Sequence, residues 1–327
     1  MMRLARGQRF LALFVSGALL PLSLAPFYFW PIAIVSMAVL FRNLQEQTPK
    51  QALAKSLVFG FGMFFAGASW VYVSIHEHGF IPAPMALIAT TLFCLFMAVL
   101  FALPFILSAL IPQNPASWLI GLPSIWVLSE WFRSWAFTGF PWLYSGYAHT
   151  ETWLSGWAPI GGVMWLSFLT ALAAALLSQL SQGRRNQRSA KMALISVIAA
   201  VVSGYFLQQV SWTSPTGKNL SVVLIQPNTD QNKKWTYSER EGILQQLQNQ
   251  TQPHWGADII IWPEAAIPTT PKNVWKFLDR LDRQAKVNQT ALITGIPTYD
   301  ASRRLFFNSV IALGANRGQY NKTRLVP

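Results

Sequence analysis

Cysteine and acidic residues are scarce in this chain, and each scarcity narrows what the protein can be. Only one residue, Cys94, is a cysteine, which excludes a disulfide bond within these 327 residues. Of the 12 Asp and Glu residues, four fall in residues 1–211 and eight in residues 212–327. Charged residues make up 11% of the chain, against about 25% in an average soluble domain. We therefore predict two domains, a membrane domain over residues 1–211 and a globular domain over residues 212–327.

Long apolar runs predict the helices of the first domain. A helix that crosses a bilayer needs about 20 predominantly apolar residues. We expect a bundle of seven transmembrane helices, at about 9–24, 27–41, 56–75, 84–111, 116–132, 158–181 and 192–210.

The distribution of basic residues predicts the orientation of this bundle. With the N-terminus inside, the outer loops 76–83 and 133–157 carry a single basic residue, Arg133. Inner loops of membrane proteins are enriched in Lys and Arg. Seven spans from an inside N-terminus place residues 212–327 outside. Ten basic residues then lie inside: Arg3, Arg6, Arg9, Arg42, Lys50, Lys55, Arg184, Arg185, Arg188 and Lys191.

Strand-like and helix-like segments alternate in the second domain. Runs rich in β-branched residues end at turn residues, and two polar segments between them show a one-faced apolar pattern. This alternation predicts an α/β layer architecture. We expect strands at 220–226, 258–262, 290–296 and 307–313, and helices at 237–252 and 271–288.

The net charge of +13 does not indicate nucleic-acid binding, because no motif of that kind accompanies it. Five basic residues at helical spacing in the second domain form either a solvated helix face or a contact with anionic lipid headgroups. They are Lys272, Lys276, Arg280, Arg283 and Lys286.

Three residues of the second domain are candidates for chemistry. Glu264 follows a buried strand at the edge where open α/β sheets bind ligands, and it is a candidate general base if partial burial raises its pKa. Lys322 follows a short strand over 318–321, where its ammonium would stabilise an oxyanion. Trp235 would line an acyl or headgroup pocket. The alternatives are a surface or capping glutamate, an exposed lysine and a tryptophan in a local core.

Several motifs together resemble the bacterial apolipoprotein N-acyltransferase family, whose members carry a nitrilase-like (carbon–nitrogen hydrolase) domain. The resemblance runs along essentially the whole chain, and the order and spacing of the motifs make it specific. Its marks are Glu130-Trp131-Phe132-Arg133-Ser134-Trp135, Gly139-Phe140-Pro141-Trp142-Leu143, Gly146-Tyr147, Gln226-Pro227-Asn228, Lys234-Trp235, Trp262-Pro263-Glu264, Gly295 with Pro297, Asn308-Ser309, Tyr320-Asn321-Lys322 and Leu325-Val326-Pro327.

The resemblance implies an activity and a role for each candidate. It implies an αββα sandwich for the second domain, a general base at Glu264, oxyanion stabilisation by Lys322 and a substrate pocket that includes Trp235. A cysteine thiolate in such enzymes takes an acyl chain from a phospholipid as a thioester. The α-amino group of a lipoprotein's diacylglyceryl-cysteine then attacks in a ping-pong transfer. No metal or soluble cofactor is implied. The implied location is the bacterial inner membrane, with the catalytic domain on the periplasmic side.

The nucleophile is the point where this chain departs from the family. Cys94 lies inside an apolar run, so we interpret it as a small apolar filler rather than a reactive thiol. We expect an incomplete chain that holds only the first part of the nitrilase-like domain and has no turnover alone.

The alternatives are a membrane-anchored amidase of the nitrilase class, a transporter with an outer binding domain, and a non-catalytic truncated homologue. Glu130 and Arg133, three residues apart in one predicted span, would form an ion pair or guide substrate.

Overall fold

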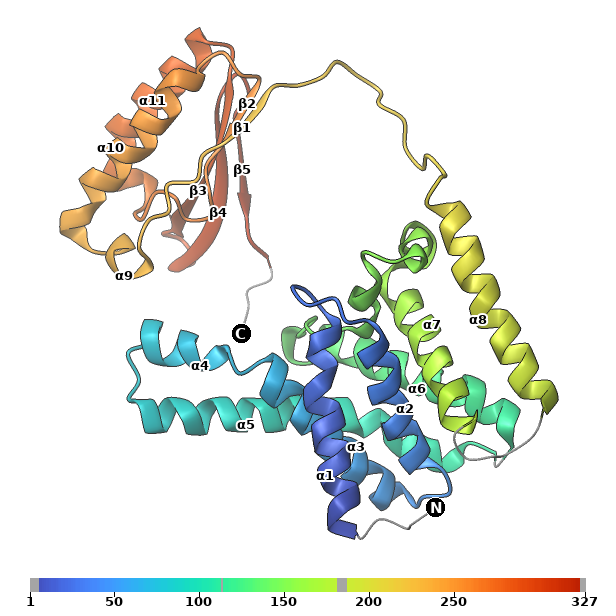
Figure 1. Ribbon diagram of the computed structural model, residues 1–327. Helices are drawn as coiled ribbons and strands as arrows, with labels where there is room; N and C mark the ends of the chain where they lie inside the picture. Colours follow the sequence, from blue (N-terminus) through green and yellow to red (C-terminus); the bar gives the residue numbers. More distant parts are fainter. Residues whose placement is uncertain (1–5, 113, 181–186, 324–327) are drawn as a thin grey trace. The chain divides into compact units, whose positions relative to one another are not determined.

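The computed structural model describes residues 6–112, 114–180 and 187–323 and divides into two compact units, Met1–Ser214 and Pro215–Pro327 (Figure 1). This division falls close to the expected boundary between residues 211 and 212. The predicted inner residues Arg3, Arg184 and Arg185 lie outside the described residues, as does the motif Leu325-Val326-Pro327.

The first unit is helical throughout its regular structure. Each predicted apolar run coincides with a helical segment. The helices are α1 (Arg6–Leu19), α2 (Pro31–Leu44), α3 (Pro49–Gly67), α4 (Val71–Val73), α5 (Ala83–Ala102), α6 (Pro115–Trp135), α7 (Ala158–Leu180) and α8 (Gln187–Leu207).

The length and composition of these helices do not confirm seven membrane spans. Two helical segments, Ala83–Leu110 and Trp153–Leu180, are long and apolar enough to cross a bilayer. A third possibility is Pro49–Gly67 with Val71–His78, a pair bent by 59°. The apolar helices Gly7–Ser23, Pro31–Leu44 and Leu194–Leu207 fall short of the required length. The described residues therefore hold two or three candidate spans, and the seven-span count stays a prediction.

Close backbone contact and a cluster of aromatic rings hold the first unit together. A Cβ at Gly17 would lie 2.0 Å from the carbonyl oxygen of Phe59, so α1 and α3 approach too closely for a side chain at this position. Small residues at such crossings are typical of membrane helices. The core around Trp126 consists of buried aromatic rings in contact, from Phe41, Phe59, Phe101 and Phe105.

The second unit contains one five-stranded mixed sheet in the order β1-β2-β3-β4-β5. β1, β2 and β3 are parallel, whereas β4 is antiparallel to both β3 and β5. The strands are β1 (Val222–Leu224), β2 (Ile259–Ile261), β3 (Ala291–Asp300), β4 (Leu305–Gly314) and β5 (Gly318–Asn321), and the helices are α9 (Gln231–Lys234), α10 (Arg240–Thr251) and α11 (Trp275–Val287).

Figure 1 shows α10 and α11 on the same side of this sheet. Right-handed crossovers from β1 to β2 and from β2 to β3 require this placement. The core between sheet and helices includes Leu247, Ile260, Phe277, Leu281 and Leu292, all buried. The five predicted strands, including the short strand over 318–321, and both long helices are present, although the first two strands have only three residues each. One sheet with helices on one face is half of an αββα sandwich, so the full sandwich stays a prediction.

Candidate functional site

Glu264 lies on a turn that begins where β2 ends. Two hydrogen bonds hold Trp262, at the end of this strand. Its backbone N–H donates to the Ile293 carbonyl (2.8 Å), and its indole N–H donates to Thr251 Oγ1 (2.9 Å). Within the turn, Ala265 has a φ of 47°, a left-handed conformation that is uncommon for residues other than glycine. The buried tryptophan and this bend together direct Glu264 away from the core.

Gly295 of β3 allows the turn to lie against the sheet. A Cβ at this position would be 2.4 Å from the Ala265 nitrogen and 2.9 Å from the Glu264 Cα. The Gly295 carbonyl also accepts a hydrogen bond from the Ile267 N–H (3.2 Å). Glycine is therefore required by close backbone approach, and it sets the position of the Glu264 backbone.

Lys322 reaches the same carboxylate from the other end of the sequence. Its Nζ lies 3.4 Å from Glu264 Oε1, across 58 residues of sequence. The strand register produces this approach, because β5 pairs with β4 from Ser309↔Asn321 to Ala312↔Gly318. The next residue, Lys322, donates its backbone N–H to the Asn308 carbonyl (2.9 Å). The structure thus brings together two residues that the sequence singled out separately.

Asn308 and Lys234 are two further members of the site. The Asn308 amide Nδ2 donates a short hydrogen bond to Glu264 Oε1. Lys234, at the end of α9, donates from Nζ to the Glu264 backbone carbonyl (3.2 Å). Partial burial lowers the pKa of Lys234, and the nearby Glu264 carboxylate opposes that shift. Among the described residues, both side-chain contacts of Glu264 fall on Oε1, so Oε2 is open to accept a proton.

The partial burial expected for Glu264 is not found. Its side chain is 67% exposed, and that of Lys322 is 39% exposed. Trp235, which follows Lys234 directly, is also exposed and belongs to no buried core cluster of the residues that the structure describes. The site is therefore an open cluster of polar groups beside an exposed aromatic ring.

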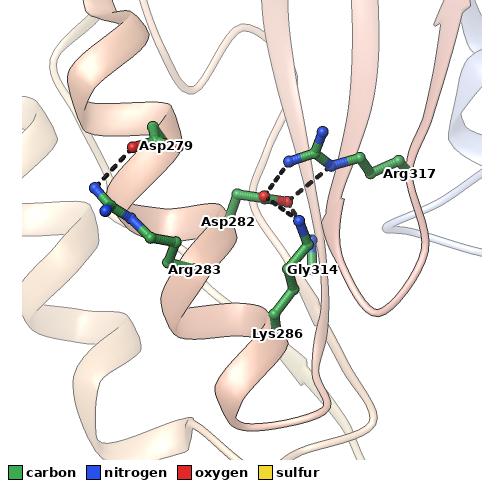
Figure 2. Close-up of polar contacts among 6 residues, drawn as sticks. All are labelled: Asp279, Asp282, Arg283, Lys286, Gly314 and Arg317. Atoms are coloured by element: carbon green, nitrogen blue, oxygen red, sulfur yellow. Dashed lines mark hydrogen bonds and ion pairs between the residues drawn. The ribbon is translucent and has the colours of Figure 1, made fainter.

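A separate network anchors the hairpin that leads to Lys322 (Figure 2). Asp282 of α11 is buried, and its carboxylate accepts the Gly314 N–H (3.0 Å), the Lys286 ammonium (2.8 Å) and both Nε and Nη2 of Arg317. Hydrogen bonds from Arg317 hold the pKa of the Asp282 carboxyl well below its ordinary value. Gly314 and Arg317 flank the turn between β4 and β5, so this network fixes the start of β5.

Cys94 lies in the core of the first unit. Its side chain is fully buried, and its thiol lies 3.5 Å from the Phe64 carbonyl oxygen. Burial supports the interpretation of Cys94 as a packing residue.

Glu130 and Arg133 do not form the predicted ion pair. Both are buried, but Glu130 Oε1 accepts hydrogen bonds from the Trp126 indole (2.8 Å) and from the backbone and hydroxyl of Ser145. Arg133 donates from Nη1 to the Trp142 carbonyl (3.1 Å). Through Ser145 and Trp142, both side chains contact the loop that follows α6.

Sequence reasoning assigned no role to Gly295, Asn308 or Lys234, although all three stand in the motifs that carry the family resemblance. The register of β4 and β5, with Asn321 opposite Ser309, places Asn308 beside Lys322, and the sequence did not predict that register. The contact of Lys234 with Glu264 depends on the path of the loop between β1 and α10, which no periodicity predicts.

A parallel strand that ends at a carboxylate, with a lysine delivered from a later strand, fits the carbon–nitrogen hydrolase class. Residues 221–327 match the family model for carbon–nitrogen hydrolases, and residues 16–176 match that for the apolipoprotein N-acyltransferase N-terminal domain. The chain belongs to the apolipoprotein N-acyltransferase family, and the resemblance seen in the sequence is confirmed.

Three curated relatives named apolipoprotein N-acyltransferase illustrate the match. That of Coxiella burnetii is 39% identical over 316 residues, which are 96% of this chain and 65% of the relative. That of Pseudomonas syringae is 37% identical over 95% of this chain and 63% of the relative, and that of Vibrio cholerae 38% over 93% and 60%. The chain thus spans less than two thirds of the length of these relatives.

Proposed function

We propose that the protein of which these residues are part transfers an acyl chain from a phospholipid to the α-amino group of a lipoprotein's N-terminal diacylglyceryl-cysteine. Membership of the apolipoprotein N-acyltransferase family supports this proposal. The observation that carries it is the contact of Lys322 Nζ with Glu264 Oε1 at 3.4 Å, at the carboxyl end of β2.

The proposed chemistry uses each charge of this pair. Glu264 takes the proton of a cysteine thiol, and the thiolate attacks the ester carbonyl of the phospholipid. Lys322 stabilises the oxyanion of the tetrahedral intermediate. The intermediate expels the lysophospholipid alkoxide, which takes up the proton held by Glu264, and leaves an acyl thioester. The lipoprotein amine then attacks the thioester and gives up a proton to Glu264. The amide forms as the thiolate leaves.

The proposal requires a nucleophilic cysteine other than Cys94. The burial of Cys94 within the first unit argues against nucleophilic attack by its thiol. The required thiol therefore has to come from residues other than the 327 of this sequence. We place Trp235 in the substrate pocket, because its exposed ring follows Lys234, which contacts the Glu264 backbone.

We also propose that the enzyme lies in the bacterial inner membrane with its catalytic unit on the periplasmic side. The family and the apolar helices Ala83–Leu110 and Trp153–Leu180 support a membrane location. The basic residues of the sequence support the orientation, because ten lie in predicted inner segments and one in the outer loops.

An acyl-transfer assay with the full gene product tests this function. The assay supplies a phospholipid and a synthetic diacylglyceryl-cysteine peptide and measures the N-acylated peptide by mass spectrometry. Glu264→Gln should lower the rate about 100-fold or more, the range expected for loss of a general base. Glu239→Gln, an exposed glutamate at the start of α10, is the matched control and should not change it.

Two outcomes would contradict the proposal. One is a Glu264→Gln variant that transfers acyl chains at the unchanged rate. The other is a wild-type protein that hydrolyses small amides and acylates no peptide, which would identify the membrane-anchored amidase instead.

A further inference from the structure

A cavity in the first unit lies between the beginning of α1 and the first turns of α3. Its volume is about 580 Å³. It is far in sequence from Glu264, and the proposed acyl transfer does not use it. The lining residues are Arg9, Phe10, Leu13, Gln47, Lys50, Gln51, Ala54 and Lys55.

Three of the lining residues, Arg9, Lys50 and Lys55, are basic, and none of the described lining residues is acidic. Like charges around one cavity repel each other, and the repulsion is stronger at a partly buried site than in water. An anion in the cavity would interact favourably with all three.

The N-terminus of α3 adds to this positive potential. Thr48 caps the helix, because its hydroxyl accepts the Gln51 N–H while the Gln51 side chain accepts the Thr48 N–H (3.1 Å). The first turn of this 19-residue helix borders the cavity through Lys50 and Gln51. The N-terminal end of a helix carries partial positive charge and favours anions.

Hydrogen bonds hold the Lys55 side chain in place and, among the described residues, leave one of its N–H donors unused. Its ammonium donates to the Asn43 carbonyl (2.8 Å) and to Gln47 Oε1 (2.7 Å). An ammonium has three N–H donors, so one remains for a ligand. Lys50 is exposed and makes no hydrogen bond or ion pair within the described part of the chain.

Apolar side chains also line the cavity, beside the polar side chains of Gln47 and Gln51. They are Phe10, Leu13 and Ala54, of which Leu13 has no exposed surface. A free inorganic anion gains nothing from Phe10 and Ala54, whereas a lipid would lay the start of an acyl chain along them. A cavity lined by both cations and apolar side chains fits an amphipathic anion.

We propose that this cavity binds an anionic phospholipid, with its phosphate among Arg9, Lys50 and Lys55 and an acyl chain beside Phe10 and Ala54. Basic pockets between membrane helices are known to hold such headgroups. The ends of α1 and α3 that form the site lie on the inner side of the membrane in the predicted orientation. The lipid would therefore come from the inner leaflet.

Native mass spectrometry of the full gene product in detergent, titrated with phosphatidylglycerol, tests the proposal. The wild type should bind phosphatidylglycerol in preference to phosphatidylcholine. Lys50→Gln should weaken phosphatidylglycerol binding about fivefold, the effect of removing one basic residue near a lipid surface. Lys50→Arg keeps the charge and should bind as the wild type does, and Lys191→Gln, an exposed lysine of α8 outside the cavity, should leave binding unchanged.

Three results would overturn the proposal: equal binding of phosphatidylglycerol and phosphatidylcholine, equal losses in Lys50→Gln and Lys191→Gln, or displacement of the lipid by millimolar inorganic phosphate. The last would identify a phosphate site rather than a lipid site. Because Lys50 makes no structural contact, loss of fold does not explain a weaker affinity in Lys50→Gln, and an unchanged thermal midpoint would verify this.

Discussion

At the scale of single residues, two donors lie at Glu264 Oε1, one on β4 and one on the residue that follows β5. The Asn308 amide, on β4, donates a hydrogen bond to Oε1. The Lys322 ammonium, on the residue after β5, lies 3.4 Å from the same oxygen. Both donors hold the carboxylate in one orientation. Because both donors contact Oε1, Oε2 is the oxygen that can accept the proton. Asn308 therefore positions the base and does not touch the reacting atoms.

We predict that Asn308→Ala lowers the acyl-transfer rate of the full gene product about tenfold or more, because a hydrogen bond to a charged group contributes about 1.5–3 kcal/mol. The reduction should fall on kcat rather than on KM, since Asn308 orients the base and does not bind substrate. Asn316→Ala, at an exposed position in the turn between β4 and β5, is the control. A rise in KM with kcat unchanged would show that Asn308 binds substrate.

The sequence identified Glu264 and Lys322 because strand ends and their motifs are local features. It did not predict their distance, which depends on β5 pairing with β4 in one register, nor the exposure of Glu264. The exposure of a side chain depends on which distant segments pack over it, and a local sequence pattern does not show this. Asn308 was visible only as part of a motif, since its contact arises from the packing of the Glu264 turn against Gly295.

At the scale of elements, α11 controls where β5 begins. Asp282 joins the helix to Gly314 and Arg317 on either side of the turn between β4 and β5 (Figure 2). β5 has four residues, so it has few ladder hydrogen bonds of its own to fix its place. The Asp282 network therefore stabilises the segment that delivers Lys322.

This network predicts an acid-dependent stability. The pKa of Asp282 is lower in the folded protein than in the unfolded chain, so its contribution is complete above about pH 4 and is lost as the pH falls below that value. Asp282→Asn should reduce stability at pH 7 by about 1.5–3 kcal/mol, towards the lower end because Arg317 is largely exposed.

Thermal unfolding of the full gene product between pH 3 and 7 measures this effect. The difference between wild type and Asp282→Asn should shrink as the pH falls. Asp279→Asn is the matched control, because the ion pair of Asp279 with Arg283 lies on the exposed surface of α11. A difference that stays constant across this range would contradict the assignment.

The sequence predicted the alternation of strands and helices in the second unit because it depends on local periodicity. The sequence predicted the lengths of the strands less well. The first two strands contain three residues each, where the apolar runs predicted five or more, because pairing with neighbours rather than hydrophobicity decides where a ladder ends. The direction of β4 and β5 depends on the tight turns between them and was not predicted.

At the scale of the whole molecule, composition predicted two units and seven membrane spans, and the structure has two units. The helices coincide with the apolar runs, but only two or three described segments are both long and apolar enough for a span. Short helices cross a bilayer only where it is locally thinned or where flanking residues reach the interface. The orientation of the second unit depends on the number of spans.

Reporter fusions to alkaline phosphatase, which is active only outside the inner membrane, test the seven-span prediction. Fusions after Gly79 and Thr213 should be active, and those after Gln47 and Lys191 inactive, because the predicted spans alternate between these positions. Similar activity of the Gly79 and Lys191 fusions would show that fewer segments cross.

The central claim is that Glu264 and Lys322 act as one catalytic unit, and a double-mutant cycle on the acyl-transfer rate of the full gene product tests it most directly. The four proteins are the wild type, Glu264→Gln, Lys322→Gln and the double variant. Residues that act together show strongly non-additive losses. We predict that the double variant is no slower than the slower single variant, within about threefold. Losses that multiply in the double variant would contradict the claim, because they would show two residues acting independently.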